Sequence, residues 1–216
     1  YDFRIYQSVE IELSAGVNLV CGANGHGKTS LLEAISLLST GRLLRGGKDS
    51  LAIRHERTES KVECRAGDTG TTISVQLSAG KRKRVELNSL NLPRASDIIG
   101  RLPTISFSAS DLTIARGEPS ERRQFLDWEL AQLYPAYLKN LTTYKRALEQ
   151  RNSLLKQAQE SHVPEDIFEA WEVQIATSGV ALRKTRRDWI EVISDIAKGY
   201  HEFLGGGENF ALSYLP

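Results

Sequence analysis

The chain has 216 residues, of which 40% are hydrophobic and 25% are charged, and its 28 Lys and Arg against 27 Asp and Glu leave a net charge of +1. These values exclude a wholly disordered chain, and they leave any nucleic-acid binding to local basic patches. At roughly 100–200 residues per domain, we expect one large domain or two unequal lobes.

The sequence has no pattern typical of a membrane or secreted protein. No apolar run approaches the roughly 20 residues of a spanning helix, and no signal peptide opens the chain. The two cysteines, Cys21 and Cys64, predict neither a disulfide framework nor a zinc cluster, so we expect a cytoplasmic protein. Because the chain contains no methionine, we expect either a fragment or a sequence from which methionine positions are missing.

The first third of the chain has the pattern of strands and one helix. Apolar and polar residues alternate over 9–14, which predicts a half-buried strand, and the apolar run 17–21 predicts a buried strand. A glycine-rich turn follows, and the apolar spacing over 31–38 predicts a helix that ends near Gly41.

A strand meander is expected next. Short apolar segments separated by turn residues predict strands over 61–67, 72–78 and 83–87. A short helix over 96–99 and a further short strand over 104–107 follow.

The second half is expected to be helical. From Glu118 to about residue 203 the apolar residues recur at helical spacing, with a break at 161–164. Their steps of three, four and seven are typical of a helix packed along a partner, and the short connection favours antiparallel neighbours. The alternation over 210–214 predicts a return to strand.

We therefore predict three parts. Residues 1–107 form a sheet lobe, residues 108–205 form an inserted helical lobe, and residues 206–216 form a return strand into the first lobe.

The clearest motif fits the pattern G-x-x-x-x-G-K-[ST] of phosphate-binding loops and reads Gly22-Ala23-Asn24-Gly25-His26-Gly27-Lys28-Thr29-Ser30. Its glycines let backbone N–H groups approach phosphate oxygens, and Lys28 brings a positive charge to the β- and γ-phosphates. The Thr29 hydroxyl can ligate Mg²⁺. His26 occupies a variable position and is expected to contribute only its backbone.

An acidic residue at the end of an apolar strand normally completes such a site. Asp127 and Glu129 lie within a helical pattern and do not fit this role. We therefore assign no catalytic residue within the chain, and expect the missing acid beyond residue 216.

Several further stretches are distinctive: Phe3-Arg4-x-Tyr6, Asn24-Gly25-x-Gly27-Lys28-Thr29, Leu31-Leu32-Glu33-Ala34-Ile35, Thr40-Gly41-Arg42-x-x-Arg45-Gly46, Gly117-Glu118-Pro119-Ser120-Glu121-Arg122-Arg123-Gln124-Phe125-Leu126-Asp127 and Tyr144-x-x-Ala147-Leu148-x-Gln150-Arg151-Asn152-Ser153-Leu154-Leu155-Lys156. Together they resemble the RecF family of ABC-type ATPases of recombinational DNA repair, and the resemblance covers nearly the whole chain. Two departures stand out: Ile5 replaces the usual Asn, and Ser108-Ala109-Ser110-Asp111 replaces the usual Ser-Pro-Glu-Asp.

The resemblance implies an α/β fold, with a P-loop NTPase sheet lobe like an ABC ATPase head and an inserted α-helical lobe. It implies ATP and Mg²⁺ as cofactors, an ATP-dependent homodimer, and binding to duplex DNA or to single-strand/double-strand junctions. RecF proteins act in recombinational repair and replication-gap processing and help to load RecA with RecO and RecR. A weak DNA-linked ATPase is then expected of the full-length protein.

Basic residues outside the loop are candidate contacts to phosphates of the nucleotide or of DNA: Arg4, Arg42, Arg45, Lys81, Arg82, Lys83 and Arg84. For each of them a solvated surface position is the alternative. The pair Arg122-Arg123 is expected to order the junction between the lobes through i,i+4 ion pairs with Glu118 and Asp127. The basic cluster Arg183-Lys184-x-Arg186-Arg187 is expected to lie on a solvated helix face.

Three other functions remain open from the sequence: an ATPase subunit of another chromosome-maintenance or transport complex, a small-molecule kinase, and an interaction module with a vestigial nucleotide site. The Glu-Pro-Ser-Glu-Arg-Arg segment disfavours the transport subunit, and the intact Lys28-Thr29 pair disfavours a vestigial site.

Overall fold

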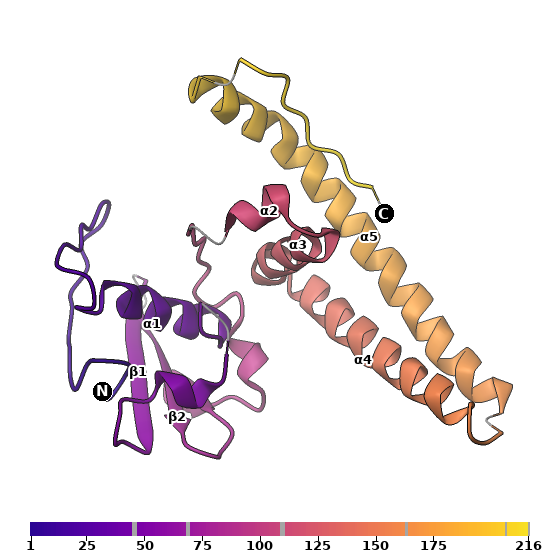
Figure 1. Ribbon diagram of the computed structural model, residues 1–216, viewed down its shortest axis with the longest axis horizontal. Coiled ribbons are helices and arrows are strands. Elements are labelled where there is room, and N and C mark those ends of the chain that lie inside the picture. The colour runs from indigo at the N-terminus through magenta and orange to yellow at the C-terminus, as the bar shows by residue number, and fades with distance from the viewer. Residues whose placement is uncertain (45–46, 68–69, 109–110, 163, 206, 216) are drawn as a thin grey trace. The chain divides into compact units, whose positions relative to one another are not determined.

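The computed structural model describes residues 1–44, 47–67, 70–108, 111–162, 164–205 and 207–215 (Figure 1). The chain divides into two compact units, Tyr1–Phe107 and Ser108–Pro216. Among the described residues, no helix has the length and apolarity that crossing a membrane requires.

The first unit contains a four-stranded antiparallel sheet in the order β1-β2-β3-β4, with β1 at Glu59–Ala66, β2 at Thr71–Ser78, β3 at Arg84–Leu87 and β4 at Leu90–Asn91. The predicted meander is thus confirmed. The register pairs Val62 with Val75 and Val75 with Val85, so apolar residues lie opposite one another across three strands.

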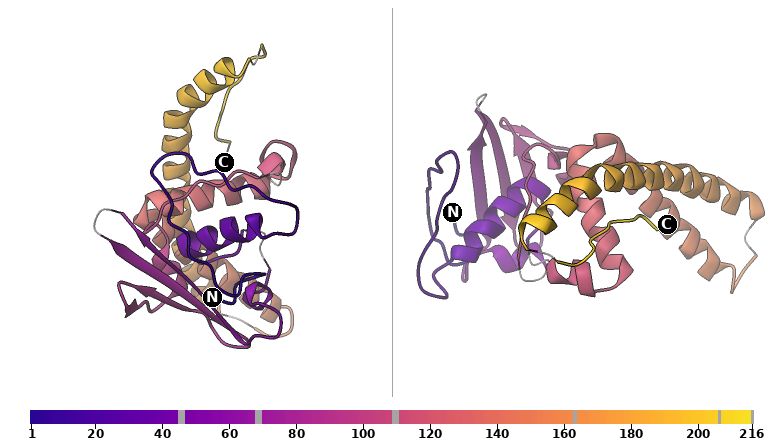
Figure 2. Two further views of the ribbon diagram at one scale, coloured as in Figure 1. Left: turned by 90° about the vertical axis from the view of Figure 1, so that its left-hand side faces the viewer. Right: turned by 90° about the horizontal axis from the view of Figure 1, so that it is seen from above.

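Helix α1 (Lys28–Thr40) packs against this sheet (Figures 1 and 2). Leu37 and Leu38 of α1 are buried with apolar residues of β2 and β3, which include Ile73, Val75 and Val85. The helix ends as predicted at Gly41, which adopts a left-handed conformation (φ 69°) and donates its N–H to the Leu37 carbonyl. Two short 3₁₀ helices, η1 (Asp49–Ala52) and η2 (Ala95–Ile98), complete the unit.

Three predicted strands are wrong: residues 9–14, 17–21 and 104–107 form no strand in the structure. Val17 is 95% exposed and Leu19 84% exposed, so their pattern is apolar but their side chains are not buried. A strand exists only when a neighbour accepts and donates its backbone hydrogen bonds. The described residues place no such neighbour beside these segments.

The second unit is helical, with α2 at Leu112–Arg116, α3 at Pro119–Leu133, α4 at Pro135–Gln157 and α5 at Glu165–Phe203. Proline at the first position of α3 and α4 lacks the N–H that a helix start would leave unpaired. The Glu118 N–H donates to the Glu121 carboxylate at 2.9 Å, which further caps α3.

Helices α4 and α5 form the predicted antiparallel pair (Figures 1 and 2). Tyr137 contacts Arg186, and Arg151 contacts Glu172, so 14 residues forward on α4 correspond to 14 residues backward on α5. Between these contacts, Gly179 lies against the Tyr144 ring: a Cβ on Gly179 would lie 3.3 Å from Tyr144 Cε2.

The segment after α5 does not form the predicted return strand. Residues 207–215 run back along α5 without strand hydrogen bonds (Figures 1 and 2), while 206 and 216 lie outside the described residues. The alternation itself is real: Phe210, Leu212 and Tyr214 are half-buried, and the Phe210 ring stacks on His201 with ring centroids 5.0 Å apart. The alternating side chains therefore pack on a helix instead of a sheet.

Candidate phosphate-binding site

The glycine-rich loop lies directly before α1, with Gly27 at the N-cap. Gly25 and Gly27 have φ of 85° and 90°, a left-handed conformation that other residues adopt only with strain. The helix start has no side-chain cap and no acidic residue in its first turn. Its free N–H groups and the positive end of its dipole are therefore available to an anion.

Lys28 closes the loop from within. Its ammonium donates to the carbonyl oxygens of Gly22 and Ala23, at 2.7 and 2.8 Å. The ammonium thus lies within the loop where the sequence predicted phosphate oxygens to bind. Thr29 is exposed in the first helical turn, and Ser30 follows half-buried.

The remaining loop residues, Ala23, Asn24 and His26, are exposed. The His26 N–H donates to the Ala23 carbonyl at 3.4 Å, so the backbone turns back on itself here. The structure thus places residues 22–30 at one helix end, where backbone N–H groups, the Lys28 ammonium and the Thr29 hydroxyl are candidate contacts for a phosphate and its metal ion.

A tight turn over Phe3–Tyr6 lies against this helix end. The Tyr6 N–H donates to the Phe3 carbonyl, and Phe3 is buried in the core of the first unit. A Cβ on Gly27 would lie 2.7 Å from the Tyr6 hydroxyl oxygen and 2.9 Å from Ile5 Cδ1. Glycine is therefore favoured at this position, because any side chain would force Tyr6 or Ile5 to move and would be strained at a φ of 90°.

Arg4 of this turn was a predicted phosphate contact, and the structure gives it a protein partner. Its Nε and Nη2 donate to both carboxylate oxygens of Glu33 at 2.8 and 3.0 Å, and its Nη1 donates to the Leu51 carbonyl at 2.7 Å. Glu33 is a helix residue that the sequence analysis did not single out. An acidic residue placed one turn before Leu37, in line with the apolar residues of the helix, was the sequence signal that could have identified it.

An open pocket of about 520 Å³ lies beside the helix end. Arg4 and Ser30 line one part of it, and Leu51, Ile53, Arg54 and Arg57 line another. Arg54 and Arg57 both contact the Asp2 carboxylate, at 3.4 and 3.5 Å. The pocket therefore combines aliphatic and guanidinium groups next to the phosphate-binding loop.

The basic run 81–84 separates into two kinds of residue. Lys83 donates to the Gly41 carbonyl at 2.6 Å and pairs with Asp49, and Arg84 pairs with Glu86 at 2.9 Å. Lys83, directly before β3, thus links this strand to the end of α1 and to η1, whereas Arg84 is 59% exposed and makes a pair within its own strand, so neither contact supports the prediction that these residues contact nucleic acid. Lys81 and Arg82 are exposed in the turn between β2 and β3.

The other predicted arginines follow α1. Arg42 is exposed, and its backbone N–H donates to the Thr40 hydroxyl at 3.2 Å. Arg45 lies outside the described residues, as do Ala109 and Ser110 of the divergent segment.

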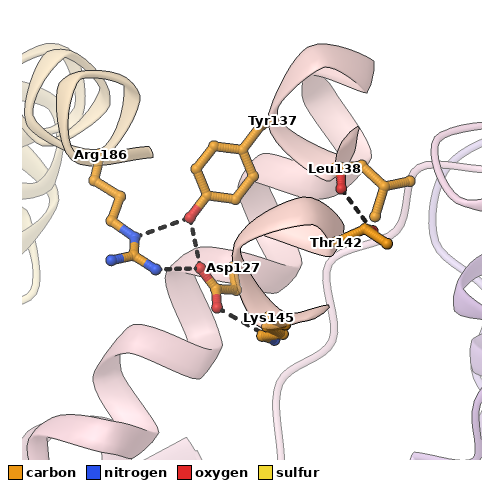
Figure 3. A network of polar contacts seen from close by, with 6 residues as sticks. All are labelled: Asp127, Tyr137, Leu138, Thr142, Lys145 and Arg186. Carbon is orange, nitrogen blue, oxygen red and sulfur yellow. Dashed lines mark hydrogen bonds and ion pairs between the residues drawn. The ribbon is translucent and has the colours of Figure 1, made fainter. Parts of the chain in front are cut away.

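The helical unit contains a polar network that sequence spacing did not predict (Figure 3). The Tyr137 hydroxyl and Arg186 Nη2 donate to Oδ1 of Asp127 at 2.5 and 2.6 Å, and Arg186 Nε donates to the Tyr137 oxygen at 2.9 Å. Lys145 Nζ lies 3.6 Å from the second Asp127 oxygen. One carboxylate thus joins α3, α4 and α5.

This network corrects two expectations, the i,i+4 ion pairs of Arg122 and Arg123 and the solvated position of Arg186. Asp127 bonds Arg186 and not Arg123, and Arg122 donates to the Gly117 carbonyl at 2.8 Å. Arg186 therefore points into the helical unit, while the side chain of its neighbour Arg187 is 58% exposed.

Burial raises the pKa of the Tyr137 phenol, and its hydrogen bond to Asp127 raises it further. Burial alone would lower the pKa of the Arg186 guanidinium, but the hydrogen bond and charge of Asp127 outweigh this and raise it. A hydrogen bond with Tyr214 of the returning segment acts in the same direction. The network therefore holds a neutral phenol between two charged groups.

Comparison with known proteins places this loop and these helices in a family. The family model described as an AAA domain matches residues 2–196. The chain is 35% identical to the DNA replication and repair protein RecF of Lachnospira eligens over 220 residues, which is 100% of this chain and 61% of the relative. It is also 35% identical to RecF of Listeria innocua, over 99% of this chain and 58% of the relative. The chain thus spans about three fifths of the length of these curated relatives.

A solved structure of the recombination mediator protein RecF with ATP superposes with a TM-score of 0.88 and 31% identity, over 94% of this chain and 55% of that one. A second RecF structure, with an ATP analogue, gives a TM-score of 0.86 and 30% identity over 94% of this chain and 56% of that one. The fold is therefore that of a P-loop ATPase, as the sequence predicted. With an AAA domain model over most of its length and RecF relatives over nearly all of it, the chain belongs to the RecF family.

Proposed function

We propose that this chain binds the triphosphate of ATP on residues 22–30. The observation that carries the proposal is the Lys28 ammonium held inside a glycine loop at an uncapped helix start. An incoming phosphate would take over the ammonium from the two carbonyls and meet the free N–H groups of the first turn. A RecF relative of the same fold has been solved with ATP.

Mg²⁺ fits the same site as a second cofactor. The Thr29 hydroxyl is exposed one residue after Lys28, and Mg²⁺ is usually held by one or two protein oxygens, phosphate oxygens and water. The bound ion would neutralise charge on the phosphates.

The pocket beside α1 would receive the nucleoside part of ATP. Ser30 belongs both to the loop motif and to the pocket wall, so a ligand held by its phosphates can extend into this space. The aliphatic side chains of Leu51 and Ile53 would contact a base, and Arg4 would supply hydrogen-bond donors.

The bound nucleotide would act as a switch for DNA binding in recombinational repair and replication-gap processing, with an ATP-dependent homodimer as the DNA-binding state. Lys81 and Arg82, exposed at a hairpin turn, are the proposed contacts to DNA phosphates, and Arg42 and Arg45 are further candidates. By family resemblance the protein would act in the cytoplasm with RecO and RecR to load RecA.

The test measures binding of the full natural chain to duplex and gapped DNA, with and without ATP, over a range of salt. We expect ATP to strengthen binding only when Mg²⁺ is present, and Thr29→Ala to reduce this stimulation. A double Lys81→Ala/Arg82→Ala variant should weaken binding and lower the slope of log K against log salt by about two. Arg183→Ala/Lys184→Ala removes two exposed charges from α5 and serves as the matched control.

Two results would refute the proposal. The first is a lack of ATP binding by folded protein in magnesium buffer. The second is ATP-dependent phosphorylation of a small acceptor without any effect of ATP on DNA binding, which would indicate a kinase.

A further inference from the structure

The carboxylate of Glu33 is an unusual feature of the phosphate-loop helix. Its side chain is only 4% exposed and lies in α1, one turn beyond Ser30. A buried charge is costly unless it is paired and hydrogen-bonded. The two hydrogen bonds from Arg4 supply that pairing, so Glu33 and Arg4 form one unit.

The unit fixes a guanidinium group at the wall of the pocket. Three nitrogen atoms of Arg4 are committed to Glu33 and to the Leu51 carbonyl, while its side chain stays 24% exposed and lines the pocket. Arg4 also has φ 54°, a left-handed conformation that costs a non-glycine residue about 1 kcal/mol or more. The surrounding contacts therefore hold Arg4 in a conformation that it would not adopt alone.

The same face of α1 carries the loop, the pocket wall and the buried acid. Gly27, Ser30 and Glu33 follow one another at steps of three, which places them on one side of a helix. The turn that contains Arg4 contacts Gly27 at one end of this face and Glu33 at the other. A shift of Arg4 would therefore change the shape of the site at the point where a nucleotide would extend from the loop into the pocket.

We infer that Glu33 is a positioning residue for nucleotide binding: it orients Arg4 so that the remaining N–H groups of the guanidinium meet the nucleoside part of the ligand. This inference rests on the proposed binding of ATP. Glu33 itself touches no ligand, and its effect passes through Arg4.

A charge effect and a positioning effect of Glu33 predict opposite changes in ATP affinity when the carboxylate is removed. A carboxylate near a triphosphate repels it, so removal of the Glu33 charge should strengthen ATP binding if charge alone mattered. A positioning role predicts the opposite, because Glu33→Gln leaves the Arg4 fork with one acceptor oxygen in place of two.

The experiment compares two ligands by calorimetry on the full natural chain in magnesium buffer. ATP has phosphates and a nucleoside, whereas inorganic tripolyphosphate has phosphates alone. We expect Glu33→Gln to weaken ATP binding about tenfold, the loss of one charge-assisted hydrogen bond, and to leave tripolyphosphate binding unchanged. Glu63→Gln is the matched control, because Glu63 lies on β1 outside the pocket lining with a 50% exposed side chain, and it should not weaken ATP binding.

A second variant keeps the test independent of folding. Arg4→Gln and the double Arg4→Gln/Glu33→Gln should each weaken ATP binding about as much as Glu33→Gln alone, since the two residues act as a unit. Thermal unfolding of each variant shows whether it is folded at the assay temperature.

Each outcome decides the matter. Selective loss of ATP affinity with non-additive variants supports the inference. Unchanged or tighter ATP binding by Glu33→Gln overturns it, and so does an equal loss for both ligands, which would mean general damage to the loop. Failure of the unaltered protein to bind either ligand overturns the proposed function, and this inference with it.

Discussion

Arg186 is expected to contribute more to stability than any neighbouring cation on α5. In Arg186→Leu, the Asp127 carboxylate would lose its 2.6 Å partner while remaining only 12% exposed, and Tyr137 would lose a 2.9 Å hydrogen bond. Removing one member of a buried ion pair costs about 3–5 kcal/mol. Lys145 at 3.6 Å from Asp127 offsets part of the loss, so we expect unfolding to become easier by about 2–4 kcal/mol.

Urea unfolding followed by far-ultraviolet circular dichroism measures this difference. Arg187→Leu is the matched control on the same helix, because its side chain is 58% exposed and its partners are Asp188 and Glu191. Exposed pairs of this kind contribute about 0–1 kcal/mol. If the two variants lose equal stability, the description of Arg186 as a buried anchor of three helices is refuted.

Three further predictions follow from named contacts. Burial and the Asp127 carboxylate raise the pKa of Tyr137, so the native state keeps the phenol proton at a pH where the unfolded chain loses it, near the ordinary value of 10. The free energy of unfolding should therefore fall as the pH rises above 10, and it should fall less steeply in Tyr137→Phe, which has no such proton. Gly27→Ala should cost more stability than Gly16→Ala, since both glycines have φ near 90° but only a Cβ at position 27 would lie 2.7 Å from the Tyr6 hydroxyl oxygen. Equal losses of stability in thermal melts would contradict this steric argument. Lys83→Ala should lower stability by about 1–2 kcal/mol without changing the salt dependence of DNA binding. Lys81→Ala should reduce the salt dependence of DNA binding without lowering stability. Thermal melts and DNA titrations of the two variants distinguish these cases.

Local patterns predicted the elements that local physics determines. The helix after the loop ends at Gly41, because glycine alone takes the left-handed cap without strain. Helix α3 begins at Pro119, as predicted, where a missing N–H is harmless, whereas the break between α3 and α4 before Pro135 was not predicted. The meander followed from alternation because its strands are consecutive and supply one another's hydrogen bonds.

What the sequence missed depends on partners far along the chain. Residues 9–14 and 17–21 have a strand pattern, yet a pattern does not supply the neighbour that a strand requires. Glu33 finds its arginine 29 residues earlier, and Asp127 finds Arg186 59 residues later. The i,i+4 rule predicted Arg123 as the partner of Asp127, but a largely buried carboxylate that accepts hydrogen bonds from both Tyr137 and Arg186 outweighs a surface pair of a few tenths of a kcal/mol.

The two carbonyl contacts of Lys28 bear on how variants of such loops are interpreted. This side chain stabilises the loop, and the carbonyl groups of Gly22 and Ala23 would lose their shared donor in Lys28→Ala. A lower nucleotide affinity in Lys28→Ala would then have two causes, the loss of the positive charge and the loss of the hydrogen bonds that hold the loop backbone. Lys28→Met keeps the size of the side chain but not its hydrogen-bond donor, and Lys28→Arg keeps the charge in a side chain of different length. The three variants together therefore separate the role of Lys28 in holding the loop backbone from its electrostatic role.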